Sequence, residues 1–143
     1  MLNVVRDKDE VKLMKKKLEE MKKRFGLREE HSEEYEVEIE AGDDDFQEKV
    51  IEKSKKIPVL VDFYASWCFP CKILSPTLEK IVRDYNGKFI LAKVNVDEAQ
   101  IVASEFGIMS IPTVVLFKNG EPVDYFVGAL PESQIKDWLK RRL

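Results

Sequence analysis

The sequence predicts an α/β fold built on a mixed sheet. Residues 59–64 (VLVDFY) and 89–96 are short, largely apolar runs, the pattern of strands that are covered on both faces. Helical patterns alternate with these strands, an order typical of parallel strands joined by helices. Two further apolar segments flank Asn119-Gly120, a pair that favours a tight hairpin turn. We therefore expect an α/β sandwich with a parallel core and one antiparallel hairpin on its edge.

Composition places the chain among globular domains with a charged surface. Hydrophobic residues make up 44% of its 143 residues, enough for a packed core, and charged residues make up 36%. The net charge of −3, with mixed signs, gives no general attraction to nucleic acid. No stretch approaches the roughly 18 apolar residues of a membrane helix, and residues 1–10 turn charged before a signal-peptide core could form. We expect a cytoplasmic protein without nucleic-acid or membrane partners.

The N-terminal segment, residues 1–34, is predicted to be a charged helix followed by a linker. Its apolar residues recur at alternating spacings of three and four, which aligns one narrow stripe on a helix over residues 7–25: Val11, Met14, Leu18, Met21 and Phe25. Residues 27–34 are polar and acidic, as in a linker. The stripe is too short to identify a coiled coil. Packing on the chain's own domain, contact with a second copy or another partner, and disorder are the alternatives for this helix.

The elements around the first apolar strand follow from period and helix-start signals. Residues 35–40 alternate between charged and apolar or aromatic positions, the mark of a half-buried strand. Residues 43–45 open a helix, whose expected inward residues are Phe46, Val50 and Ile51. After the strand at 59–64, another helix is expected to begin at the cysteines, and its predicted inward residues are Ile73, Leu74, Leu78 and Ile81.

The second half of the chain completes the alternation. Residues 98–106 form a short predicted helix after the strand at 89–96. The hairpin comprises residues 114–117 and 123–127, joined through the turn described above. A closing helix is expected to bury Ile135, Trp138 and Leu139. The result is five strands in one mixed sheet, with helices on both of its faces.

Both cysteines lie in one short stretch, SWCFPCK (66–72), directly after the strand at 59–64. Cys68 falls where a helix begins, and Cys71 lies one turn inside on the same side. Pro70 fits the first turn, where its missing N–H removes no helical hydrogen bond. Free backbone N–H groups favour a thiolate at Cys68, so we expect its pKa to lie below the ordinary value and Cys71 to be better shielded. One sulfur can then attack while the other resolves.

Other roles for the two cysteines fit the sequence less well. A structural zinc site needs four ligands, whereas the chain has two cysteines and one histidine, His31, in the predicted linker. Residue 72 is Lys, so the C-x-x-C-H pattern of haem attachment is absent. A Cys–His hydrolase is disfavoured as well, because the chain has no second histidine to draw on. An inert structural disulfide is disfavoured because a helix start makes thiols reactive. We expect neither a metal nor a bound cofactor.

Five stretches of the chain together resemble the thioredoxin family. They are VDFYASWCFPCK (61–72), AKVNVD (92–97), FGIMSIPT (106–113), LFKNGE (116–121) and VGAL (127–130), and they occur in the family's order and approximate spacing. The resemblance implies a thioredoxin fold over residues 35–143. It also implies a protein-disulfide reductase that acts on target proteins by dithiol–disulfide exchange, contributes to cytosolic redox homeostasis and is recharged by a thioredoxin-reductase-like electron donor.

The resemblance assigns a role to two residues outside the cysteine motif. Asp62 matches the family's buried carboxylate behind the resolving cysteine. A carboxyl group in an apolar strand should have a raised pKa, and its implied role is to take the proton from Cys71. Lys93 matches the lysine that neighbours this acid. A hydrogen-bonded aspartate at a strand end and a lysine that merely extends to solvent are the structural alternatives.

Further matches concern the surface that meets the substrate. Pro112 matches a proline with a cis peptide bond, which would place the Ile111 backbone beside the sulfurs. The apolar rim that receives an extended substrate segment is matched by Trp67, Ile111, Gly128 and Ala129. Phe69 and Pro70, between the cysteines, are expected to adjust redox poise and partner fit. A core position is the alternative for Trp67. Pro76 matches the proline that kinks the active-site helix.

Two departures from the family pattern leave alternatives open. Phe69 stands where the family usually has glycine, and Tyr64 stands where an additional tryptophan is common. The same fold could serve as a disulfide oxidase or isomerase, or as a binding module whose thiols are incidental. A reduction potential near the roughly −270 mV known for thioredoxin itself would support the reductase, whereas roughly −180 or −120 mV would support isomerase or oxidase work.

Overall fold

The computed structural model describes residues 8–24 and 36–143. The chain divides into two compact units, Met1–Tyr35 and Glu36–Leu143. The first contains the helix α1 (Lys8–Arg24), which agrees with the predicted helix; the predicted linker, with His31, lies outside the described residues. Four side chains of the apolar stripe are between 39% and 62% exposed: Val11, Met14, Leu18 and Met21. The fifth, Phe25, lies outside the described residues. Within the described ranges, no helix is long and apolar enough to span a membrane.

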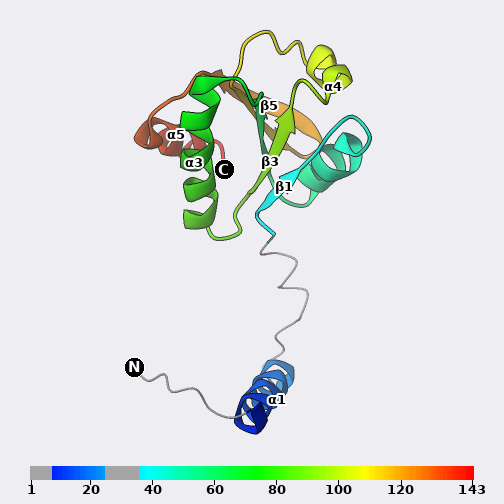
Figure 1. Ribbon diagram of the computed structural model, residues 1–143, viewed down its shortest axis with the longest axis vertical. Coiled ribbons are helices and arrows are strands. Elements are labelled where there is room, and N and C mark those ends of the chain that lie inside the picture. Colours follow the sequence, from blue (N-terminus) through cyan, green and yellow to red (C-terminus); the bar gives the residue numbers. More distant parts are fainter. Residues whose placement is uncertain (1–7, 25–35) are drawn as a thin grey trace. The chain divides into compact units, whose positions relative to one another are not determined.

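The second unit is built on one five-stranded mixed sheet, drawn in Figure 1. Its strands are β1 (Glu38–Glu40), β2 (Val59–Tyr64), β3 (Ile90–Asn95), β4 (Thr113–Lys118) and β5 (Glu121–Val127). They are arranged in the order β1-β3-β2-β4-β5. Strands β1, β3 and β2 are parallel to one another, and β4 runs antiparallel to both of its neighbours, β2 and β5. The predicted parallel core with a hairpin on its edge is therefore confirmed.

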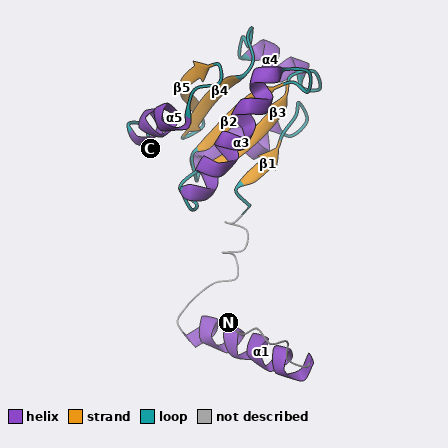
Figure 2. Cartoon of the chain, turned by 60° about the vertical axis from the view of Figure 1, so that its left-hand side comes forward, coloured by secondary structure: helices purple, strands orange, loops and turns teal. Residues whose placement is uncertain are grey.

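Helices cover both faces of this sheet (Figures 1 and 2). One face carries α3 (Phe69–Asp84) and α5 (Glu132–Lys140), and the other carries η1 (Gln47–Glu52), η2 (Lys53–Lys55) and α4 (Gln100–Glu105). Each layer closes a separate apolar core against the sheet. In Figure 2, α3 crosses in front of β2 and β3, which brings the helix that begins at the cysteines over the centre of the sheet.

The alternation of side chains along β2 decides what lies near α3. Leu60 packs in the core under α3 and α5, whereas Val61 and Phe63 pack in the core under η1 and α4. Successive side chains of a strand point to opposite faces. Asp62, two residues after Leu60, therefore lies on the α3 face, and it is fully buried there.

Two expectations about the helices need correction or refinement. Ile73 was expected to point inward, but it is 53% exposed, while Leu74 is buried. Successive residues of an α-helix are rotated by about 100° around its axis. Leu74, Leu78 and Ile81 share the buried face of α3, and Ile73 is rotated away from that face towards solvent. The helix predicted after residue 43 is present, but η1 is wound as a π-helix and η2 as a tight 3₁₀ turn.

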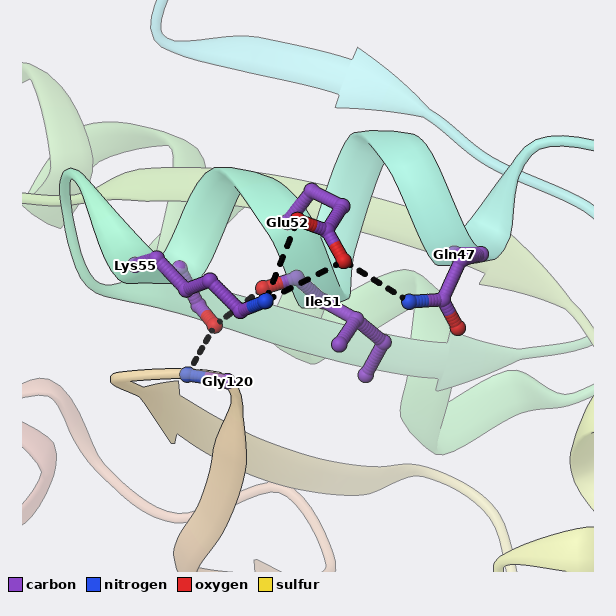
Figure 3. A network of polar contacts seen from close by, with 6 residues as sticks. Gln47, Ile51, Glu52, Lys55 and Gly120 are labelled. Carbon is purple, nitrogen blue, oxygen red and sulfur yellow. Dashed lines mark hydrogen bonds and ion pairs between the residues drawn. The ribbon is translucent and has the colours of Figure 1, made fainter.

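The hairpin turn has the backbone that its sequence predicts. Asn119 and Gly120 both have positive φ, 56° and 86°, as a two-residue turn between right-twisted strands requires. The turn is anchored on η2, because the buried Ser54 accepts hydrogen bonds from both: Asn119 N donates to its carbonyl at 2.8 Å and Gly120 N to its Oγ at 2.9 Å. The surrounding polar network, shown in Figure 3, includes Gln47, Ile51, Glu52 and Lys55.

Candidate redox site

The two cysteines lie at the junction of β2 and α3. Cys68 has an extended backbone and caps α3, which begins at Phe69 with Pro70 in its first turn. The Cys68 Sγ accepts a hydrogen bond from the Cys71 N–H at 3.2 Å, and the two sulfurs form a disulfide with a Cα–Cα distance of 5.3 Å. The predicted placement of both cysteines on one side of a helix start is therefore confirmed.

The disulfide lies in a small apolar cluster of its own. Ala65 is buried with both cysteines, and Tyr64 and Ile111 are among the partly buried residues that pack against them. Cys68 is 4% exposed and Cys71 2%, so the expected better shielding of Cys71 is only a small difference in this disulfide form. Since so little of either residue is exposed, access to the sulfurs depends on the residues around them.

Asp62 is the titratable group buried behind this helix start. Its Oδ2 accepts a hydrogen bond from Ser75 Oγ at 3.0 Å. Its Oδ1 is buried and has no hydrogen-bond partner among the residues that the structure describes. Burial raises the pKa of Asp62 to about 6, although the Ser75 hydrogen bond and the charge of Lys93 lower it. The raised pKa expected for a carboxyl group in this strand is thus present.

Lys93 neighbours Asp62 but does not pair with it directly. The two are partners in the parallel register of β2 and β3. The Lys93 Nζ lies 3.4 Å from Glu79 Oε2 and 5.1 Å from the centre of the Tyr64 ring. The Lys93 ammonium therefore pairs with Glu79 and not with Asp62. The charge of Glu79 raises the pKa of Asp62, while that of Lys93 lowers it.

Sequence reasoning missed Ser75 and Glu79, although a signal was available. Cys71, Ser75 and Glu79 recur every four residues along α3, which places them in one row on the helix. The contacts of Ser75 with Asp62 and of Glu79 with Lys93 show that this row faces β2 and β3. A search for polar side chains four and eight residues after the resolving cysteine would have found them.

The loop before β4 lies beside the disulfide. The Ile111–Pro112 peptide bond is cis, as the resemblance implied. Ile111 packs against the cluster that contains both cysteines. The Gly128 N–H donates a hydrogen bond to the Pro112 carbonyl at 2.9 Å. Gly128 has a φ of 98°, in the region of backbone conformation that favours glycine. The end of β5 is thereby tied to this loop, and Ala129, which follows, is exposed.

Exposed apolar side chains accompany the disulfide. Trp67 is 69% exposed and Phe69 is 70% exposed, so Trp67 is not a core residue. The Trp67 Nε1 donates a hydrogen bond to Asp97 Oδ2 at 2.8 Å, a partner that sequence reasoning did not assign. Met109, two residues before Ile111, is 94% exposed and was also not singled out. An apolar surface that includes aromatic side chains is suited to contact an extended segment of another protein.

The arrangement suits exchange between a dithiol and a disulfide. A thiolate at a helix start is stabilised by free N–H groups, and a buried carboxyl group with a pKa about 6 can exchange a proton near neutral pH. In the ranges 8–24 and 36–143, no group of three His, Cys, Asp or Glu side chains could hold a metal ion.

Comparisons with known proteins agree with this chemistry. The Thioredoxin family model matches residues 37–141. The chain is 50% identical to a thioredoxin of Chlorobaculum thiosulfatiphilum over 97 residues, which covers 68% of this chain and 88% of that protein. It is 44% identical to thioredoxin 1 of a Nostoc strain over 101 residues, covering 71% and 92%. Mitochondrial thioredoxin of Bos taurus is 46% identical over 97 residues, covering 68% of this chain and 57% of the relative.

Proposed function

This chain belongs to the thioredoxin family, and from that premise we propose how its side chains divide the reduction of a target disulfide. It is a thioredoxin-type thiol-disulfide oxidoreductase, a protein-disulfide reductase, with its C-x-x-C active site at Cys68 and Cys71. The observation that supports the assignment of roles is the position of Asp62: a fully buried carboxyl group under α3, hydrogen-bonded one turn beyond Cys71.

The proposed reaction begins with the reduced pair. The Cys68 thiolate attacks one sulfur of the target disulfide, forms a mixed disulfide and releases the other target sulfur, which takes a proton from water. Cys71 then gives its proton to Asp62 and attacks the Cys68 sulfur. The Cys68–Cys71 bond forms, and the second target sulfur leaves as a thiolate that is protonated in turn. The cysteine pair loses two electrons and the Cys71 proton, and the target gains two electrons and two protons, the first of which comes from water.

In this proposal Lys93 acts on Asp62 through its charge, without a direct ion pair between them. The ammonium lowers the pKa of the carboxyl group and so keeps part of it ionised, and able to accept a proton, near neutral pH. Support comes from their pairing in the register of β2 and β3 and from the low exposure of the Lys93 side chain, 22%. An entirely solvated lysine would be screened and would have little influence on Asp62.

We assign target binding to the surface around the disulfide. Its exposed members are Trp67, Phe69, Pro70 and Ala129, and it is completed by the partly buried Ile111 and Gly128 and the buried Pro112. The exposure of Trp67 and Phe69 supports this role, because covering large exposed aromatic side chains makes a favourable contribution to the free energy of binding. The packing of Ile111 against the cysteines supports it too, since a peptide bound there would lie beside the sulfurs.

The family implies target proteins and a thioredoxin reductase in general terms, and the more specific assignments are ours. We propose that residues 35–143 are the catalytic domain and that residues 1–34 determine which partners the chain binds or whether it self-associates.

We also propose a cytoplasmic location. Residues 1–34 contain nine Asp and Glu residues, unlike transit peptides, which are poor in acidic residues. Fusing residues 1–34 to a fluorescent protein and following its location tests this; import into an organelle would contradict it.

The decisive experiment uses the two serine variants of the full chain. Cys68→Ser should abolish dithiothreitol-driven insulin reduction and form no mixed disulfide. Cys71→Ser should also lose turnover, but it should accumulate a mixed disulfide that mass spectrometry detects, because the attacking thiol remains while the resolving thiol is absent. Trapping by Cys68→Ser instead of Cys71→Ser would reverse the assigned order of attack. Full activity in both variants would contradict the proposed reaction.

A further inference from the structure

The side chain that holds the buried acid is Ser75, which lies on α3 between Cys71 and Glu79. Each of these residues is four positions from the next, so they stand about 6 Å apart in one row on the helix. Ser75 is thus the neighbour, along the helix, of the cysteine that must lose a proton. It is also the donor to Asp62, with Oγ 3.0 Å from Oδ2.

The two oxygens of Asp62 have different surroundings. Oδ2 accepts the Ser75 hydrogen bond, whereas Oδ1 has no hydrogen-bond partner among the described residues, although it is buried. A buried carboxylate oxygen that accepts no hydrogen bond is costly to keep charged. Protonation at Oδ1 removes that cost, while protonation at Oδ2 would have to disturb the existing hydrogen bond. Oδ1 is therefore the preferred site for an incoming proton.

We propose that Ser75 is a positioning residue for Asp62, whose hydroxyl holds Oδ2 in place and leaves Oδ1 to receive the proton of Cys71. This inference rests on the proposed role of Asp62 as the proton acceptor. The step itself is a proton transfer: the Cys71 S–H bond breaks and an O–H bond forms at Oδ1. The Cys71 thiolate then attacks the Cys68 sulfur, which breaks the mixed disulfide and releases the target thiolate. Ser75 keeps its own proton throughout and donates it in a hydrogen bond to Oδ2.

The same hydrogen bond sets the balance between the two forms of the acid. A donor to a carboxylate stabilises the ionised form, which is the form that can accept a proton. The other charged groups that act on Asp62 are Lys93 on β3, which favours ionisation, and Glu79 on α3, which opposes it. Tyr64, at the end of β2, interacts with the charges of Asp62 and Lys93. Removing the Ser75 hydroxyl leaves these groups in place, so its contribution can be measured separately.

The test follows the titration of Asp62 and the chemistry together. In the reduced full chain, carbon-13 NMR of the Asp62 carboxyl gives its titration midpoint. The pH dependence of mixed-disulfide resolution is measured in parallel by rapid quench. Ser75→Ala should move both midpoints upward by about one pH unit, the loss expected for a hydrogen bond to a charged acceptor. Ser75→Thr, which keeps the hydroxyl, should restore both. Ser104→Ala, an exposed serine on α4, should move neither.

Two outcomes separate this inference from the function on which it rests. If Asp62→Asn leaves the pH dependence of resolution unchanged, the proposed role of Asp62 is wrong. If Asp62→Asn removes that dependence and Ser75→Ala leaves both midpoints unmoved, only the role of Ser75 is overturned. Should Ser75→Ala fail to fold, the isosteric pair Ser75→Val and Ser75→Thr makes the same comparison. Equal midpoints in that pair would overturn the proposal as well.

Discussion

Asp62 and Lys93 are neighbours across the parallel pairing of β2 and β3, yet the Lys93 ammonium makes its ion pair with Glu79. The buried acid therefore lies beside a cation whose charge is partly compensated. Burial dominates in this balance and raises the pKa of Asp62 to about 6. Function and stability are consequently opposed at this residue, because the group suited to proton exchange is costly to bury in its charged form.

Asp62→Asn should stabilise the oxidised protein above pH 6. The folded chain holds the Asp62 proton up to a pH of about 6, whereas the unfolded chain releases it near 3.8. The free energy of unfolding therefore falls as pH rises between these two values and stays lower above them. The variant should gain up to about 3 kcal/mol at pH 7 and nothing below pH about 4. Urea denaturation at several pH values measures this, and an equal gain at every pH would contradict it.

Glu79→Gln should lower the pKa of Asp62, whereas Lys93→Met should raise it. The negative charge of Glu79 opposes ionisation of the nearby acid, and the positive charge of Lys93 favours it. Carbon-13 NMR of the Asp62 carboxyl gives the two midpoints directly. Glu105→Gln, an exposed acid on α4, is the matched control and should leave the midpoint in place. Shifts of the same sign in both test variants would exclude this arrangement of charges.

Asp97→Ala should weaken target binding more than chemistry. Asp97 accepts the indole hydrogen bond of Trp67, and losing it frees a side chain that is 69% exposed. The expected effect is a rise in KM for a protein disulfide of about two- to tenfold, as for one hydrogen bond, with kcat nearly unchanged. Glu98→Gln is the neighbouring control. A fall in kcat at constant KM would assign Asp97 a different role.

Ser54→Ala should destabilise the fold without altering the redox site. Its Oγ accepts from Gly120 N and donates to the Ile51 carbonyl at 2.8 Å, and the residue is buried. Removing the hydroxyl leaves both backbone groups without this partner, at a cost of about 1–3 kcal/mol. Urea denaturation should show this loss, while the rate of insulin reduction at 25 °C should match that of the unchanged protein. Stability equal to that of Ser104→Ala would show that the anchor is dispensable.

Elements governed by local chemistry could be predicted from the sequence. The largely apolar run at 59–64 became a strand buried on both faces, and Asn119-Gly120 formed the expected turn. The position of Cys68 at a helix start followed from the proline two residues later and the strand before it. In each case the deciding interactions lie within a few residues, so neighbouring sequence contains the necessary information.

Features that depend on contacts between distant elements were harder to predict. Ile73 was expected inside because it is apolar, but its angle around α3 directs it to solvent. Glu79 was not assigned a role, since its ion pair with Lys93 joins residues 14 positions apart in the sequence. The Trp67–Asp97 hydrogen bond spans 30 positions. Such pairs become visible only when the sheet register and the helix rotation are both known.

The burial of the disulfide also affects how fast different thiols exchange with it. With 4% and 2% of Cys68 and Cys71 accessible, a small thiol diffusing in bulk solution rarely meets either sulfur along a direction that permits displacement. A macromolecule that first docks on the surrounding surface holds its own thiol near the two sulfurs, so the thiol can attack repeatedly. At equal concentration, exchange with the disulfide should therefore be faster for a thiol held on the surrounding surface than for one that arrives by free diffusion.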